Sequence, residues 1–158
     1  MKCQSLFYTL ALGHASHGFL TRLSEPHGDS RTLSNLKRDE KMNLADAPNW
    51  ALKNVTRKIP REEEIWMGFH ITSEGYHPEW CYMLVHVKGD AKTASFSRKP
   101  CVGSNFTVSW GHAEENDGGI ITLVNQNETR RSWFGWNHVN DREKLDDVGP
   151  NATKEIPS

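Results

Sequence analysis

Alternation of apolar and polar residues is the strongest regular pattern in this chain, and it is clearest at residues 65–71. The apolar positions there are Ile65, Met67, Phe69 and Ile71. Side chains of a β-strand point alternately to opposite faces of the sheet, so this period of two predicts a strand with one buried face. Strand-like runs separated by turn-forming residues occur at 50–55, 65–71, 82–87, 94–97, 106–110, 120–124 and 132–136.

Two of these runs flank a cluster of turn residues. The run 106–110 alternates, whereas the run 120–124 is nearly continuously apolar and β-branched, which favours a strand buried on both faces or an inner strand of a closed sheet. Between them, Asp117-Gly118-Gly119 tolerates the positive φ angles of a tight reversal, so a hairpin is predicted. Residues 58–64 are charged around Pro60 and are expected to form a loop.

The spacing of the runs predicts six or seven short strands and an all-β fold, a small antiparallel sandwich or barrel. The 158 residues suit one domain, and the apolar fraction of 36% indicates unpacked ends around a smaller core. The expected divisions are a signal peptide at 1–18, a flexible leader or propeptide at 19–47, a β domain at 48–145 and a flexible tail at 146–158.

The first eighteen residues have the layout of a secretory signal peptide. Lys2 is followed by the modest apolar run 6–12 and then by small residues, so we expect cleavage and secretion. The alternative is a buried N-terminal helix or strand. The dibasic pair Lys37-Arg38 is the kind of site that a kexin-type protease cuts, or else an ordinary solvated pair of charges.

Cysteines and glycosylation sequons fit an extracellular protein. Cys3 leaves with the signal peptide, so Cys81 and Cys101 are expected to form a disulfide, whereas a cytosolic protein would keep two free thiols. Four Asn-X-Ser/Thr sequons are present, at Asn54, Asn105, Asn127 and Asn151. Asn105 falls on the outward face of its predicted strand, which agrees with a modified residue.

Candidate chemistry is sparse. A net charge of −1 argues against nucleic acid, and no run is long and apolar enough to span a membrane. The eight histidines lack a zinc-like spacing, so no metal and no cofactor is predicted. Glu114, Glu115 and Asp117 could flank a cleft as paired acids, although an acidic turn explains them more simply. We therefore assign no catalytic residue.

The segment 130–138 is the best candidate for recognition, because it combines two arginines with three aromatic residues. The residues singled out are Arg130, Arg131, Trp133, Trp136 and His138. If exposed, they form a recognition surface; if buried, they are only the last strand. The six tryptophans of the chain raise the same choice between an aromatic core and an exposed patch for a sugar or a protein.

The order of several loose motifs resembles a family of small secreted proteins of filamentous fungi, some of which are hypersensitive-response-inducing elicitors. The motifs are Trp50-Ala-Leu-Lys-Asn-Val-Thr-Arg57, Phe69-His-Ile71, Cys81, Ala94-Ser95, Cys101, Val108-Ser-Trp110, Asn116-Asp-Gly-Gly119, the strand 120–125 and the basic-aromatic stretch 130–141. The resemblance covers about residues 49–145. It departs at 58–64, where members typically carry another cysteine pair and this chain has none.

The resemblance implies an extracellular β-barrel or sandwich without catalytic residues, acting at the interface between fungus and plant. We expect an effector or elicitor that binds a host protein or a cell-wall glycan, and homodimer formation is left open. Two alternatives stay open as well: a structural or carbohydrate-binding protein of the cell wall, suggested by the tryptophans, and a small hydrolase using Glu114, Glu115 or Asp117.

Overall fold

The computed structural model describes residues 42–157. The expected signal peptide, most of the expected leader and the pair Lys37-Arg38 lie outside the described residues. The strands are β1 (Asn49–Arg61), β2 (Glu64–Thr72), β3 (Glu79–His86), β4 (Phe96–Pro100), β5 (Phe106–Ala113), β6 (Gly118–Asn125), β7 (Arg130–Trp136), β8 (Val148–Ala152) and β9 (Lys154–Glu155). Two short 3-10 helices, η1 (Leu44–Asp46) and η2 (Glu115–Asp117), are also present.

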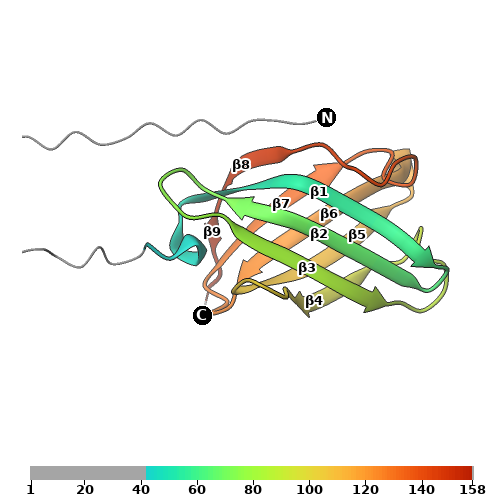
Figure 1. Ribbon diagram of the computed structural model, residues 1–158, viewed down its shortest axis with the longest axis horizontal. Coiled ribbons are helices and arrows are strands. Elements are labelled where there is room, and N and C mark those ends of the chain that lie inside the picture. Colours follow the sequence, from blue (N-terminus) through green and yellow to red (C-terminus); the bar gives the residue numbers. More distant parts are fainter. Residues whose placement is uncertain (1–41, 158) are drawn as a thin grey trace, which may run out of the picture. The chain divides into compact units, whose positions relative to one another are not determined.

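The strands form two antiparallel sheets, and Figure 1 shows β1, β2 and β3 in front of β5, β6 and β7. The first sheet has the order β3-β2-β1-β8, and the second has the order β4-β5-β6-β7-β9. The predicted all-β class is confirmed, and the two separate sheets make it a sandwich rather than a closed barrel. Each predicted strand run has a counterpart among β1 to β7.

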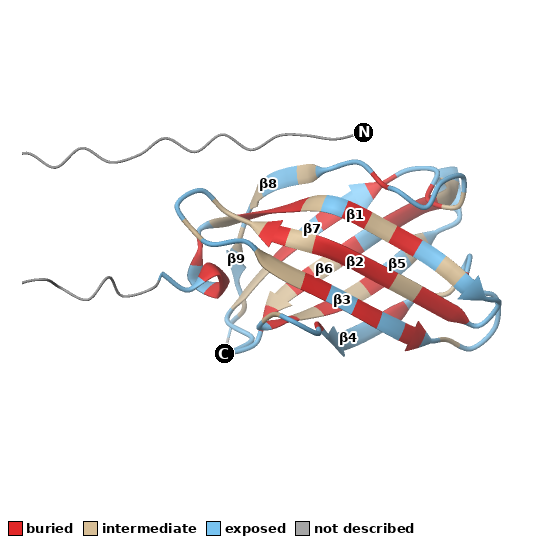
Figure 2. Cartoon of the chain, viewed as in Figure 1, coloured by how far each residue is buried: buried red, intermediate tan, exposed pale blue. Residues whose placement is uncertain are grey.

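Period-two burial builds the core. Along β2 and β3 the buried side chains alternate with more accessible ones, as the colours in Figure 2 show. Their inward residues meet those of β5, β6 and β7, and the largest completely buried side chains include Trp50, Trp110, Phe69 and Phe134. The predicted inward face of β2 is confirmed at all four of its apolar positions.

Two local predictions are wrong. The charged stretch expected to be a loop is mostly strand, because β1 continues to Arg61 and pairs with β2 up to Glu64. Pro60 is accommodated where the pairing register shifts, so its missing N–H costs no regular ladder bond. The strand expected to be buried on both faces is buried on one only, since Ile120 is 48% exposed while Ile121 is buried.

The C-terminal segment is not the flexible tail that its polar sequence suggested. β8 pairs with β1 in the first sheet, and β9 pairs with β7 in the second. At the crossing, the Thr153 N–H donates to the Pro48 carbonyl at 2.9 Å. The segment therefore connects the two sheets along one side of the sandwich and covers strand edges that would otherwise be open.

The expected boundary at residue 48 also lies too late. Leu44, Ala45 and Ala47 are buried in the core. The Trp50 indole N–H donates to the Leu44 carbonyl at 2.9 Å, and the Asn125 amide donates to the Ala45 carbonyl at 3.3 Å. Residues 44–47 therefore belong to the folded domain.

The disulfide links the opposite side of the sandwich. Cys81 of β3 is bonded to Cys101, which follows β4, and their Cα atoms are 5.0 Å apart. Next to it, Tyr82 and Val102 exchange two backbone hydrogen bonds of 3.2 and 2.9 Å. The predicted cysteine pair is thus present, and it joins the first sheet to the second where β3 and β4 approach.

Candidate recognition surfaces

The segment predicted for recognition divides between the two faces of β7. Trp133 points outward and is 37% exposed, whereas Trp136 is buried. The Arg131 guanidinium carbon lies 5.1 Å from the centroid of the Trp133 ring, and the Lys154 ammonium lies 5.6 Å from it. Arg130 instead donates to the Thr153 hydroxyl at 3.0 Å and holds the C-terminal segment in place. The exposed part is the Trp133 cluster, formed by Arg131, Trp133 and Lys154.

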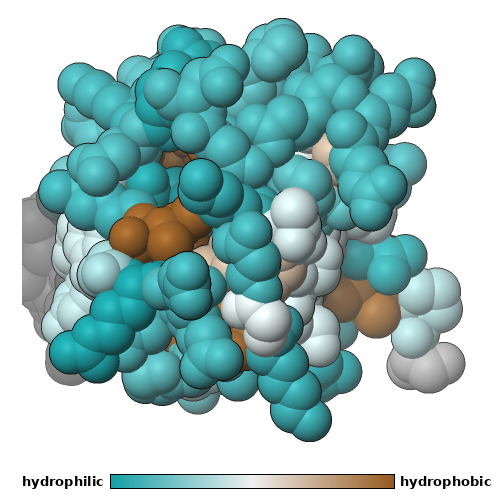
Figure 3. Space-filling view, turned by 90° about the vertical axis from the view of Figure 1, so that its right-hand side faces the viewer, coloured by the Kyte–Doolittle hydropathy of each residue, from teal (hydrophilic) through white to brown (hydrophobic). Residues whose placement is uncertain are grey.

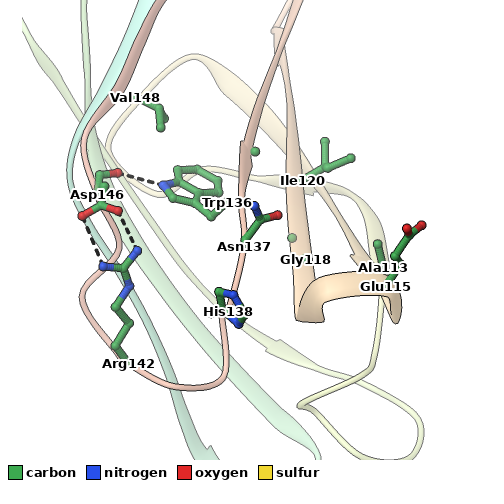
Figure 4. Close-up of a pocket in the computed structure, with 12 residues that line it drawn as sticks. Ala113, Glu115, Gly118, Ile120, Trp136, Asn137, His138, Arg142, Asp146 and Val148 are labelled. Atoms are coloured by element: carbon green, nitrogen blue, oxygen red, sulfur yellow. Dashed lines mark hydrogen bonds and ion pairs between the residues drawn. The ribbon is translucent and has the colours of Figure 1, made fainter.

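A shallow depression of about 580 Å³ lies at the far end of β7, where β6 begins (Figure 4). Gly118, Gly119 and Gly135 are among its lining residues, and the side-chain space at Gly119 is filled by the Trp110 ring. Trp136 and His138, both singled out from the sequence, contribute to its lining. The other lining residues are Ala113, Glu115, Ile120, Asn137, Arg142, Asp146 and Val148.

Polar contacts hold the rim of this depression. The Trp136 indole N–H donates to the Asp146 carbonyl at 2.8 Å. The Asp146 carboxylate accepts two hydrogen bonds from the Arg142 guanidinium, at 2.6 and 3.3 Å, and both appear in Figure 4. Figure 4 places Glu115 across the depression from this pair. His138, which follows the end of β7, and the Trp133 cluster therefore lie at separate sites.

In the acidic turn considered as a hydrolase site, Asp117 is engaged in contacts within the fold. The Asp117 carboxylate contacts His112 Nε2 at 2.9 Å and accepts hydrogen bonds from the backbone and side chain of Asn140. The hydrogen bond with His112 lowers the pKa of Asp117, with further lowering by the Asn140 bonds. A carboxyl held in its ionised form has the opposite bias from the one that a general acid needs.

Arg57 is a buried charge that sequence analysis did not single out. Its guanidinium donates to the Ala91 carbonyl at 2.8 Å and to Asn140 Oδ1 at 3.0 Å, and it lies 5.2 Å from the centroid of the Trp110 ring. Burial lowers its pKa, although arginine stays charged in proteins. Asn140 contacts both Arg57 and Asp117, and it thereby links the buried guanidinium to the loop beside the depression.

Sequence analysis also missed the aromatic face, which is the outer side of β2 and β3. It consists of Trp66, His70, Trp80, Tyr82 and Leu84. Cross-strand pairing brings these residues together, because His70 lies opposite Trp80 and Trp66 lies opposite Leu84. Tyr82 and Leu84 are 38% and 53% exposed. The tryptophan excess was the available signal, but the grouping depends on strand register.

The four sequons differ in accessibility. Asn54, Asn105 and Asn127 are exposed. Asn151 is half-buried in β8, and its side-chain amide donates to the Trp133 carbonyl at 2.6 Å. Asn151 therefore lacks the accessible position that was expected of it in a tail.

Other kinds of site receive little support from the described residues. Within 42–157, no group of three or more His, Cys, Asp and Glu residues could hold a metal ion. Over the same part of the chain, no helix is long and apolar enough to cross a membrane. The end of the sandwich that carries the β1–β2 turn is mostly hydrophilic, with small separate hydrophobic areas (Figure 3).

Fold and surface together define a small β-sandwich joined by one disulfide, with aromatic side chains on both outer faces. The family model described as Effector TSP1 matches residues 51–156, and the chain belongs to this family. No curated protein matches the chain. The match bears out the effector part of the resemblance, whereas hypersensitive-response-inducing activity stays a prediction.

Proposed function

We propose that this protein is a secreted fungal effector that binds a host protein or a cell-wall glycan at the interface between plant and fungus. The observation that carries the proposal is the effector family match over nearly the whole folded domain. A disulfide between Cys81 and Cys101 suits an oxidising compartment, and three exposed sequons suit passage through the secretory pathway.

The Trp133 cluster is the proposed contact with a host protein. Exposed tryptophan and arginine side chains are the residue types that dominate binding energy in protein interfaces. Arg131 and Lys154 add positive charge around the Trp133 ring, so a partner with an acidic surface fits best. We favour binding over hydrolysis because the Asp117 carboxylate is already engaged by His112 and Asn140.

Infiltration of the purified secreted protein into leaves tests this proposal. The wild-type protein is expected to change defence-gene expression or to cause cell death. Trp133→Ala should need a dose about tenfold higher for the same response, because one central aromatic contact is lost. Tyr82→Ala is the matched control, since it removes an exposed aromatic ring from the other sheet. A correctly folded wild-type protein without any response at any dose would contradict an effector acting on the plant.

Secretion and oligomeric state need separate measurements. Intact mass after expression in a eukaryotic host is expected to show a shortened N-terminus, added glycan and no alkylated thiol at Cys81 or Cys101. A full-length product with two reactive thiols would contradict the extracellular proposal. Homodimer formation remains part of the proposal and is measured by light scattering on the secreted protein.

A cell-wall carbohydrate-binding protein is the second candidate function. It is favoured by the aromatic face rather than by the Trp133 cluster, so each function is tested with variants of a different sheet.

A further inference from the structure

The outward side of an antiparallel sheet is usually polar, and the aromatic face is an exception. In the described part of the chain, no element covers the outer side of β2 and β3, which faces the reader in Figure 2. Exposed apolar surface continues from Leu84 and Tyr82 to Val102, which is 51% exposed and bonded to the Tyr82 backbone. Contiguous surface of this kind marks a binding site in a soluble protein.

The rings of the aromatic face form a shallow platform. Trp80 and Tyr82 are two residues apart on β3, with ring centroids 6.4 Å apart and planes inclined by only 32°. The His70 ring adds to this surface, with its centroid 4.6 Å from that of Trp80. Trp80 and Tyr82 are therefore the more nearly parallel pair, while the His70 ring is inclined by 52° to that of Trp80.

Gly68 leaves room for the rings of Trp66 and Trp80 to lie close to the sheet. A Cβ atom at this position would be 2.6 Å from the Trp66 ring and 3.1 Å from the Trp80 ring. Both indoles therefore extend over the Gly68 backbone from opposite sides, in space that any other residue would fill. The result is a flat surface without the deep pocket that an anchoring side chain of a protein partner needs.

Charge at the rim of the platform is compensated. The Glu64 carboxylate lies 3.1 Å from the Arg61 guanidinium and 3.3 Å from His86 Nδ1. Glu64 also lines a groove of about 380 Å³ together with Lys58, Pro60, Trp66 and Leu84. Because no single sign of charge prevails here, the site suits a neutral ligand with hydroxyl groups at its edges.

We propose that the aromatic face binds a neutral polysaccharide, with pyranose rings stacked on Trp80, Tyr82 and Trp66. The C–H face of a pyranose is flat and apolar, and its hydroxyl groups point sideways, where the exposed side chains of His86 and Lys58 can hydrogen-bond to them. A chain of linked pyranoses would follow the platform and the groove as one extended ligand. The proposal specifies the glycan alternative of the proposed function and assigns it to the first sheet.

Sedimentation of the secreted protein with insoluble chitin, β-1,3-glucan and cellulose tests this inference. Wild-type protein should bind at least one of them, and the double variant Trp80→Ala/Tyr82→Ala should bind at least about tenfold more weakly. Trp133→Ala is the matched control and should bind like wild type, since its ring lies on the other sheet. Thermal unfolding shows whether each variant is folded.

Gly68→Ala is a second variant that keeps every ring. Its methyl group would displace the Trp66 ring and should weaken binding by a similar factor, because the platform is no longer flat. Folded wild-type protein that binds none of the three polysaccharides would overturn the proposal, and so would a folded double variant that binds as well as wild type.

The two assays keep the two proposals distinguishable. Polysaccharide binding without any leaf response would leave this inference standing and remove the effector function on the plant. If the folded double variant lost the leaf response while wild type bound no polysaccharide, the aromatic face would be a protein interface and this inference would be wrong.

Discussion

The two outer faces of the sandwich are built by the same alternation and carry different surfaces. On the first sheet, Trp66 and Trp80 lie flat over Gly68 with compensated charges beside them. On the second sheet, Trp133 stands next to Thr122 on the neighbouring strand and is accompanied by two cations. The difference teaches that outward positions alone do not define a site, because the cross-strand neighbours decide what an exposed tryptophan can bind.

The faces also differ in how they are held. The aromatic face is next to the Cys81–Cys101 disulfide, which joins β3 to the segment after β4. The Trp133 cluster depends on noncovalent contacts with the C-terminal segment, including the bond from Asn151 to the Trp133 carbonyl. Changes to the disulfide and to the polar contacts of the C-terminal segment should therefore affect the two faces unequally, whereas changes to the shared core should affect both.

The largest effect is expected from the interior that both faces share. Trp110 is buried, and its ring occupies the space above Gly119 and stacks with Arg57. Trp110→Ala should lower the free energy of unfolding by about 3–5 kcal/mol because it leaves a cavity and an unstacked buried cation. Urea denaturation measures this loss, and both binding activities should fall together. A variant of unchanged stability would contradict this account of the core.

Removal of the disulfide should affect the two faces to different extents. The double variant Cys81→Ala/Cys101→Ala frees a loop with a sequence separation of 20 and should cost roughly 3 kcal/mol in the free energy of unfolding. Under conditions where the variant stays folded, polysaccharide binding should weaken more than the leaf response, since Cys81 lies between Trp80 and Tyr82. Equal losses in the two assays would argue that the disulfide does not position the platform.

A smaller, pH-dependent effect is expected at the η2 turn, where Asp117 contacts His112 and Asn140. The pKa of Asp117 is lowered in the folded state, so its stabilisation is present above its unfolded pKa of about 4 and is lost as the pH falls through the folded value. Asp117→Asn should cost about 1–2 kcal/mol at pH 7 and less at acidic pH, once the wild-type carboxylate is protonated. Denaturation at several pH values checks this; a cost independent of pH would contradict it.

The smallest effect on stability is expected from the sequons. In a eukaryotic host, Asn54→Gln, Asn105→Gln and Asn127→Gln should each remove one glycan, whereas Asn151→Gln should leave the glycan mass unchanged. Asn151 is half-buried and its amide is bonded to Trp133, so a glycan there would disturb the second face. Mass spectrometry gives the occupancy of each sequon. Glycan on Asn151 would contradict this prediction and would show that the residue is modified before β8 pairs with β1.

Much of the sandwich could be predicted from local patterns. The strands β1 to β7, the inward face of β2 and the cysteine pair all follow from residues close together in the sequence or from a count of cysteines. The Trp133 part of the recognition prediction is exposed, whereas Trp136 is buried, because neighbouring odd and even positions of one strand face opposite ways.

Alternation of apolar and polar residues is a property of each strand by itself, so it can be recognised from the sequence without the tertiary structure. Three features needed the fold: the sheet pairing of the polar C-terminal segment, the buried contacts of Arg57, and the meeting of Trp66 and Trp80 over Gly68. Each depends on hydrogen bonding or packing between residues distant in the chain. The period of two therefore determined which residues face outward, and the register between strands decided which of them became neighbours.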